Sequence, residues 1–182
     1  MKVLWISAIV VILDQVTKLA IKGSFRLHES IKILGEFLQF TYIENPGMAF
    51  GIQIGGKYFF TIFASIATLI IVYYLYRTRY DGFATRLALS LILGGAIGNL
   101  IDRYAYGQVI DFIDVGYASA RWPVFNIADS GVTVGMIILI TILFFERQPV
   151  EAKDEQPAFQ SGQPSPSDEH DNWKGTKEAA GS

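Results

Sequence analysis

The chain has 182 residues, of which 51% are hydrophobic, a mean hydropathy of +0.34 and a formal net charge of −2. Such a composition with long aliphatic runs is typical of integral membrane proteins and argues against a soluble enzyme. The sequence has no cysteine and two histidines, which excludes disulfides and cysteine nucleophiles and argues against a Ser-His-Asp triad or a multi-histidine metal site.

Charge divides the chain into two segments. Residues 1–147 carry twelve Lys and Arg against ten Asp and Glu, whereas residues 148–182 carry three against seven. The second segment consists largely of Gln, Ser, Pro, Gly and acidic residues, which cannot bury enough apolar surface to fold. We therefore expect one membrane domain, residues 1–147, followed by a disordered acidic tail, residues 148–182.

Four apolar segments approach the length of about 20 residues that a helix needs to cross a bilayer. We expect an all-α membrane protein with four transmembrane helices, over residues 3–21, 58–76, 87–101 and 127–145. The third segment is short, and we expect its helix to begin a residue or two earlier, at Thr85 or Arg86. No small-residue cleavage site follows the first segment, so we expect it to be retained.

The first span contains two charges. Asp14 precedes Lys18 by one helical turn, the favourable order for an acid and a base on one helix face. In a low dielectric this pairing offsets much of the cost of burial. We expect a structural role for the pair, because a carboxylate held by Lys is poorly placed to act as a base.

Two segments outside the spans are expected on the same side of the membrane. Residues 30–45 alternate apolar and polar residues around Gly35, which predicts a short β-hairpin or cradle at the membrane surface, and residues 45–51 predict a turn. Residues 102–126 are rich in Tyr, Asp and Phe, as expected for an interfacial segment at the headgroup level. Both segments are placed to cover one cavity.

The positive charges indicate an orientation. Arg77 and Arg79 lie in the short loop between the second and third spans, with Arg86 close behind. Because cytoplasmic loops carry an excess of Lys and Arg, we expect this side to be cytoplasmic. An even number of crossings then places both termini in the cytoplasm.

The third span combines small and polar residues. Small residues four apart occur here at Gly94 and Gly98, and in the fourth span at Gly131 and Gly135, a spacing that allows helix backbones to approach closely. At the end of the third span, three polar residues share one helical face: Asn99, Asp102 and Arg103. A guanidinium here can bind a backbone carbonyl; the alternative is an Asp–Arg pair that only closes the helix.

The strongest candidates for chemistry are Asp111 and Asp129. Two close carboxylates that share one proton can hydrolyse a peptide bond, one drawing a proton from water and the other protonating the carbonyl oxygen. Asn126 has the features of an N-cap, which places Asp129 in the first turn of the fourth span, where the helix dipole favours its ionised form. Asp111 then holds the shared proton.

Two other interpretations remain open from the residues alone. In the first, Asp129 only caps its helix and Asp111 is a solvated loop residue, as is expected for Asp114. In the second, the chain is a small proton-coupled transporter or channel in which Asp14, Asp102 and Asp129 relay protons. That reading requires acids at successive depths, whereas most of these acids fall near one membrane face.

Five blocks in order carry a family resemblance. They are DQVTK from Asp14, ENPGMAFG around Asn45, GGAIGNLIDR ending at Arg103, VIDFIDV with Asp111 and FNIADS with Asp129. Residues 1–147 resemble lipoprotein signal peptidase, the type II bacterial signal peptidase. The resemblance implies a four-helix aspartic endopeptidase that removes the signal peptide of a prolipoprotein just before its lipid-modified cysteine.

The resemblance also implies roles for particular residues. Asp111 and Asp129 correspond to the catalytic pair, and Asp14 and Lys18 to a motif of the first span. Residues expected to hold substrate or orient the pair are Asn45, Gly47, Asn99, Arg103 and Asn126. The resemblance implies no metal and no cofactor. It implies diacylglyceryl-cysteine prolipoproteins and membrane lipids as partners and a site near the extracytoplasmic face of the bacterial inner membrane. We further expect a monomer that binds no nucleic acid.

Overall fold

A computed structural model describes residues 3–47 and 58–146. The predicted tail and the part of the predicted turn that follows Gly47 lie outside the described residues. In chain order the elements are α1 (Leu4–Ser24), β1 (Ser30–Leu34), β2 (Leu38–Asn45), α2 (Phe59–Arg77), α3 (Phe83–Tyr106), β3 (Val109–Tyr117), β4 (Ala120–Arg121) and α4 (Ile127–Glu146).

The four predicted spans are confirmed as helices long and apolar enough to cross a membrane. Their outer surfaces expose large apolar side chains, such as Phe63 and Leu69 on α2, which are 66% and 69% exposed. A soluble protein rarely leaves such contiguous apolar surface in water, whereas a lipid environment favours it. The exposed faces therefore agree with a membrane location for the helices.

Helix α3 is longer than the sequence predicts. The expected end at Ile101 is wrong, because the helix continues through Asp102 and Arg103 to Tyr106 and ends at Gly107, whose φ of +77° forms a left-handed C-cap. The charged residues reduce the hydropathy of this turn but are compatible with a helix. Both side chains therefore project from a regular helix, as the predicted helical face of Asn99, Asp102 and Arg103 requires.

Glycines bring α3 close to its neighbours, as the sequence predicts. A Cβ atom at Gly95 would lie 2.2 Å from the Ala128 carbonyl oxygen of α4. At Gly135 of α4 it would lie 2.6 Å from the Ala88 carbonyl oxygen of α3. Since real Cβ atoms do not approach so closely, these positions require glycine for the helices to pack at this distance.

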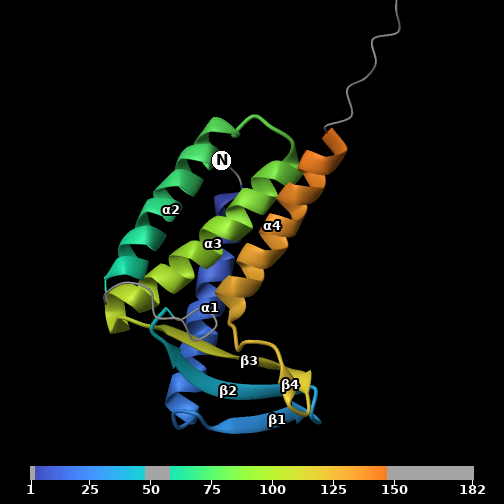
Figure 1. Cartoon of the computed structure of the whole chain (residues 1–182). Coiled ribbons are helices and arrows are strands. Elements are labelled where there is room, and N and C mark those ends of the chain that lie inside the picture. The colour runs from blue at the N-terminus through green and yellow to red at the C-terminus, as the bar shows by residue number, and fades with distance from the viewer. Residues whose placement is uncertain (1–2, 48–57, 147–182) are drawn as a thin grey trace, which may run out of the picture. The chain divides into compact units, whose positions relative to one another are not determined.

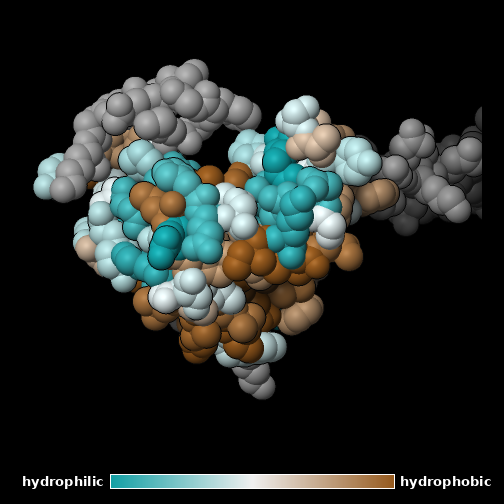
Figure 2. All heavy atoms as spheres, turned by 90° about the horizontal axis from the view of Figure 1, so that it is seen from below, coloured by the Kyte–Doolittle hydropathy of each residue, from teal (hydrophilic) through white to brown (hydrophobic). Residues whose placement is uncertain are grey.

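The strands form one antiparallel sheet in the order β1-β2-β3-β4. Residues 102–126, which the sequence predicts as an interfacial segment, contain β3, and β3 pairs along β2 and so extends the sheet beyond a hairpin. The sheet lies at the end of the bundle where α1 and α3 finish and α2 and α4 begin (Figure 1). This end carries groups of hydrophilic side chains between apolar ones (Figure 2).

A small apolar core joins α1 to the sheet. It contains Ile21 from α1, Tyr42 from β2, and Ile110 and Phe112 from β3. Burial of each large apolar side chain contributes roughly 1.5–3 kcal/mol. This core fixes β3 beneath the helix ends, and Asp111 lies between two of its members.

Candidate active site

The two candidate aspartates come from different elements at the junction of sheet and helices. Asp111 lies in β3 and Asp129 in the first turn of α4. Both contact Asn126, which precedes α4: its Nδ2 donates to Asp111 Oδ1 (2.7 Å), and its backbone N–H donates to Asp129 Oδ2 (3.3 Å). One asparagine therefore brings the two carboxyl groups together.

Asn126 is also the N-cap that the sequence predicts. Its Oδ1 accepts a hydrogen bond from the Asp129 N–H at 2.9 Å, while the Asp129 carboxylate accepts from the Asn126 N–H. This reciprocal arrangement is a capping box, which satisfies two backbone donors at the start of a helix. Capping and contact with both aspartates are thus combined in a single side chain.

A second amide supports the site from α3. Asn99 Nδ2 donates to Asp129 Oδ1 at 2.7 Å, and Asn99 Oδ1 accepts from Asn126 Nδ2 at 3.1 Å. Lys18 Nζ also donates to Asn99 Oδ1, at 2.9 Å. Because its oxygen accepts from these two donors, the Asn99 amide is oriented with its NH₂ toward Asp129. The α3 residue therefore fixes the direction of the Asp129 carboxylate.

The other side of Asp111 contacts the end of β2. Asn45 Nδ2 donates to Asp111 Oδ2 at 3.0 Å, and Asn45 Oδ1 accepts from the Gly47 N–H at 2.9 Å. Gly47 has a φ of +102°, and a Cβ there would lie 2.3 Å from the Phe60 ring. Glycine at 47 allows the chain to turn sharply and leave the Asn45 amide directed at Asp111.

Burial shapes the ionisation of Asp111. The residue is 3% exposed, and burial raises the pKa of its carboxyl to about 6, with a further rise from the negative charge of Asp129. Hydrogen bonds from Asn45 and Asn126 act in the opposite direction. Asp111 can therefore keep its proton at a pH where an ordinary carboxyl group has lost it.

Arg103 lies on α3 beside the pair. Within the described ranges its guanidinium donates one hydrogen bond, from Nη1 to the Asn99 carbonyl oxygen at 3.3 Å, and it interacts electrostatically with Asp129 and Asp111. A guanidinium has five N–H donors, so most of this donor capacity is open. The residue is positioned to bind an oxygen that approaches the two carboxyl groups.

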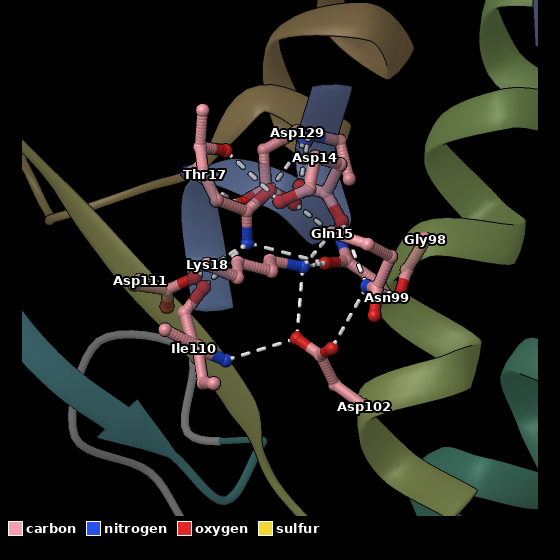
Figure 3. A network of polar contacts seen from close by, with 12 residues as sticks. Asp14, Gln15, Thr17, Lys18, Gly98, Asn99, Asp102, Ile110, Asp111 and Asp129 are labelled. Carbon is pink, nitrogen blue, oxygen red and sulfur yellow. Dashed lines mark hydrogen bonds and ion pairs between the residues drawn. The ribbon is translucent and has the colours of Figure 1, made fainter. Parts of the chain in front are cut away.

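Beneath the site lies a buried charge cluster formed by Asp14, Lys18 and Asp102. Lys18 Nζ is 2.8 Å from an oxygen of each carboxylate, and the three side chains are 0–1% exposed (Figure 3). The predicted Asp14–Lys18 pair is present as an ion pair. The alternative pairing of Asp102 with Arg103 is wrong, because Asp102 faces Lys18 of α1 while the next residue points about 100° further round the helix.

The sequence prediction for Asp114 is also wrong. The sequence predicts a solvated loop acid, but Asp114 is buried in β3, where its Oδ1 accepts from Arg121 Nε at 2.7 Å and its Oδ2 accepts from the Thr41 hydroxyl at 2.8 Å. The strand places Asp114 beside β2 and Arg121 of β4. Its contacts stabilise the sheet and do not include either candidate aspartate.

Sequence reasoning missed Gln15. Its Nε2 donates to the Gly98 carbonyl oxygen (3.1 Å) and to Asp102 Oδ1 (3.0 Å), so it links α1 to α3 next to the charge cluster. A polar amide between Asp14 and Val16 in an apolar span was the available signal. Over the described residues, no group of three or more His, Asp or Glu side chains is arranged to hold a metal ion.

Comparison with solved structures defines the class of protein. Two structures described as bacterial membrane enzymes match the chain: one has a TM-score of 0.75 and 36% identity and covers 84% of this chain and 93% of its own. The other has a TM-score of 0.69 and 38% identity, and the match covers 78% of this chain and 92% of that structure's chain. With four apolar helices and carboxyl groups held at their ends, the chain has the fold of a multi-pass membrane enzyme.

The family follows from sequence comparison. The family model for signal peptidase (SPase) II matches residues 6–145, and the chain belongs to this family of peptidases. A relative from Desulforapulum autotrophicum named lipoprotein signal peptidase is 38% identical over 79% of this chain and 92% of its own length. A second relative named lipoprotein signal peptidase, from Syntrophus aciditrophicus, is 41% identical over 74% of this chain and 86% of its own length.

Proposed function

We propose that this chain removes the signal peptide from diacylglyceryl-modified prolipoproteins, cutting just before the lipid-bearing cysteine, with Asp111 and Asp129 as its catalytic pair. The observation that carries the proposal is the contact of both carboxyl groups with Asn126 at the end of the membrane helices. Membership of the signal peptidase II family supports the reaction and its substrate class.

The two aspartates have distinct environments that support distinct roles. Asp129 accepts hydrogen bonds from Asn99 and the Asn126 N–H in the first turn of α4, so its oxygens are oriented as acceptors. Asp111, with its raised pKa, holds the shared proton. Asp129 is therefore the base and Asp111 the acid.

The reaction then proceeds in two proton-balanced steps. Asp129 takes a proton from a water molecule whose oxygen attacks the scissile carbonyl carbon, while Asp111 gives its proton to the carbonyl oxygen. The resulting diol collapses as the C–N bond breaks. Asp129 returns its proton to the leaving amine, and one diol hydroxyl returns a proton to Asp111, which restores the pair.

The surrounding polar residues divide into two groups. Asn45, Asn99 and Asn126 orient the carboxyl groups, because each donates to one or both of them. Arg103 binds a backbone carbonyl of the substrate, since its guanidinium is partly exposed and has donors to offer. Gly47 keeps the end of β2 in the turn that aims Asn45.

The geometry disfavours the transporter alternative. A proton relay requires acids at successive depths of the bilayer. In the structure Asp14, Asp102, Asp111 and Asp129 belong to one connected set of hydrogen bonds at the sheet end of the bundle. They form a local site rather than a path.

The test of substrate class uses the full chain purified in detergent. The substrates are one prolipoprotein with diacylglyceryl-cysteine and the same protein without the lipid, with the products mapped by mass spectrometry. We expect cleavage of the lipid-modified form alone, at the bond before the modified cysteine. Wild-type protein that leaves the modified form intact, or cuts it elsewhere, contradicts the proposal.

We also propose that the sheet end faces the extracytoplasmic side and that both termini are cytoplasmic. A diacylglyceryl group lies at the bilayer surface, so the scissile bond must meet the site at the edge of the hydrocarbon. The chain lacks cysteine, so single substitutions give clean labelling sites. In spheroplasts, an impermeant maleimide should label Ser119→Cys, which lies between β3 and β4. It should label Asp81→Cys, which lies between α2 and α3, only after lysis. The reverse pattern contradicts the orientation.

A further inference from the structure

The charge cluster contacts the backbone on either side of the candidate active site. Asp14 Oδ1 accepts a hydrogen bond from the Ala128 N–H at 2.9 Å, and Asp102 Oδ2 accepts from the Ile110 N–H at 3.1 Å. Ala128 directly precedes Asp129, and Ile110 directly precedes Asp111. Each buried carboxylate thus holds the backbone N–H of the residue that precedes one member of the pair.

Lys18 connects these two contacts. Its ammonium lies 2.8 Å from both carboxylates, and its remaining donor reaches Asn99 Oδ1 at 2.9 Å, so all three of its N–H groups are used (Figure 3). Asn99 in turn donates to Asp129. A single lysine therefore links the backbone of β3, the backbone of α4 and the amide that orients Asp129.

We propose that Asp14, Lys18 and Asp102 are positioning residues that set the separation and orientation of Asp111 and Asp129. The inference rests on the proposed function of that pair and assigns the cluster a role beyond stability. None of the three is placed to contact the reacting atoms. A displacement of about 1 Å at a reacting group can cost about 10²-fold in rate, so residues that fix two peptide groups have a direct effect on turnover.

The choice of charged residues supports this inference over a purely structural role. Apolar residues of similar volume often stabilise a protein as well as a buried ion pair does. They cannot accept N–H groups from two separate elements. Packing at Gly98 also supports the positioning role, because a Cβ there would lie 2.6 Å from Asp14 Oδ2. Position 98 therefore leaves the space that the Asp14 carboxylate occupies.

The test compares substitutions that keep or remove the acceptor. Asp14→Asn and Asp102→Asn retain a side-chain oxygen for the backbone N–H, whereas Asp14→Leu and Asp102→Leu remove it at similar volume. The readouts are kcat and KM for a diacylglyceryl-modified prolipoprotein and the melting temperature of the full chain in detergent. We expect the leucine variants to lose about 10²-fold in kcat with little change in KM, and the asparagine variants to lose at most about tenfold.

Ser7→Ala is the matched control for a buried contact between the same helices. Ser7 Oγ donates to the Ser90 carbonyl oxygen at 2.7 Å, joining α1 to α3 away from the aspartates. Its removal should lower the melting temperature without changing kcat. If Ser7→Ala reduces kcat as much as the leucine variants do, a general loss of packing explains the effect and the inference is wrong.

Gly98→Ala tests the same point if a leucine variant fails to fold. It keeps every polar group and displaces the Asp14 carboxylate, so we expect a loss of about tenfold in kcat at similar KM. Gly94→Ala is its control, because a Cβ there would meet Val10 and Ser7 of α1 rather than the cluster.

The outcomes separate this inference from the proposed function. If every folded cluster variant, Gly98→Ala included, keeps kcat within about twofold of wild type, which is less than 0.5 kcal/mol, the positioning role is wrong and the peptidase proposal stands. If the wild type does not cleave, or Asp129→Asn cleaves as fast as wild type, the proposed function itself fails.

Discussion

Asp14 and Asp102 contact a lysine, whereas Asp111 and Asp129 contact asparagines. In the charge cluster, Lys18 lies 2.8 Å from both carboxylates, and all three groups are excluded from solvent. Among the residues that the structure describes, neither Asp111 nor Asp129 forms an ion pair with Lys or Arg; their side-chain partners are Asn45, Asn99 and Asn126. The first pair shares one cation, and the second is held by neutral amides.

This difference matters because a cation and an amide act differently on a carboxyl group. A nearby ammonium favours the ionised form strongly and so opposes exchange of a proton. An amide N–H fixes the direction of the carboxyl group and perturbs its ionisation less, so burial and the neighbouring acid can raise the pKa of Asp111 to about 6. The structure thus separates two carboxylates that share a lysine from two carboxyl groups that amides orient.

The largest expected effect comes from removing one acid of the amide-held pair. Asp111→Asn and Asp129→Asn preserve shape but remove proton transfer, and each should lose about 10³-fold or more in single-turnover cleavage. Asp114→Asn is the matched control, since Asp114 is also buried in β3 but pairs with Arg121. Asp114→Asn should retain cleavage near the wild-type rate, and a similar loss in all three variants would contradict the assignment.

The next largest effect is on the free energy of unfolding and comes from Lys18, which holds Asp14 and Asp102. Lys18→Met leaves two buried carboxylates without their partner, which should reduce the free energy of unfolding by about 3–5 kcal/mol. Denaturation in detergent measures this loss. Lys32→Met, which breaks the exposed Lys32–Glu36 pair, serves as the control and should leave stability unchanged. Equal stability of both variants would remove the distinction between the two carboxylate pairs.

A smaller effect separates helix capping from orientation of the pair. Asn126→Ser retains a good N-cap residue, so the free energy of unfolding should change by less than about 0.5 kcal/mol from this source. The serine side chain is too short to reach Asp111 and Asn99 as the amide does, so the rate of cleavage should fall by about 10²-fold. Full activity in Asn126→Ser would favour the interpretation in which this end of α4 is only capped.

Much of the fold was predictable because it depends on local patterns. Hydropathy identified four spans, Asn126 was recognised as an N-cap by its chemistry and position, and Gly98 and Gly135 indicated close helix packing. Each of these signals lies within a few residues of the feature that it predicts. The match between sequence and structure is therefore closest within individual helices.

The errors share a different cause, because each depends on a contact that is distant along the chain. Strand β3 forms by pairing with β2, more than sixty residues away, and the acids within it obscure its alternation. Asp102 pairs with Lys18 of another helix, and Asp114 accepts a hydrogen bond from Thr41 of β2, which lies 73 residues earlier in the chain. The family resemblance named the candidate site residues, whereas the partners that hold them could be read only from the structure.

The most direct test of the central claim is a carboxyl infrared titration of the purified chain, with difference spectra against Asp111→Asn and Asp129→Asn. Because the pKa of Asp111 is raised to about 6, its proton is present below that pH and is lost as pH rises through it. The account predicts a protonated carboxyl band that disappears over this range, is absent in Asp111→Asn and is accompanied by loss of cleavage. A band that persists in Asp111→Asn and is absent in Asp129→Asn, or an Asp111 already ionised at pH 5, would contradict it.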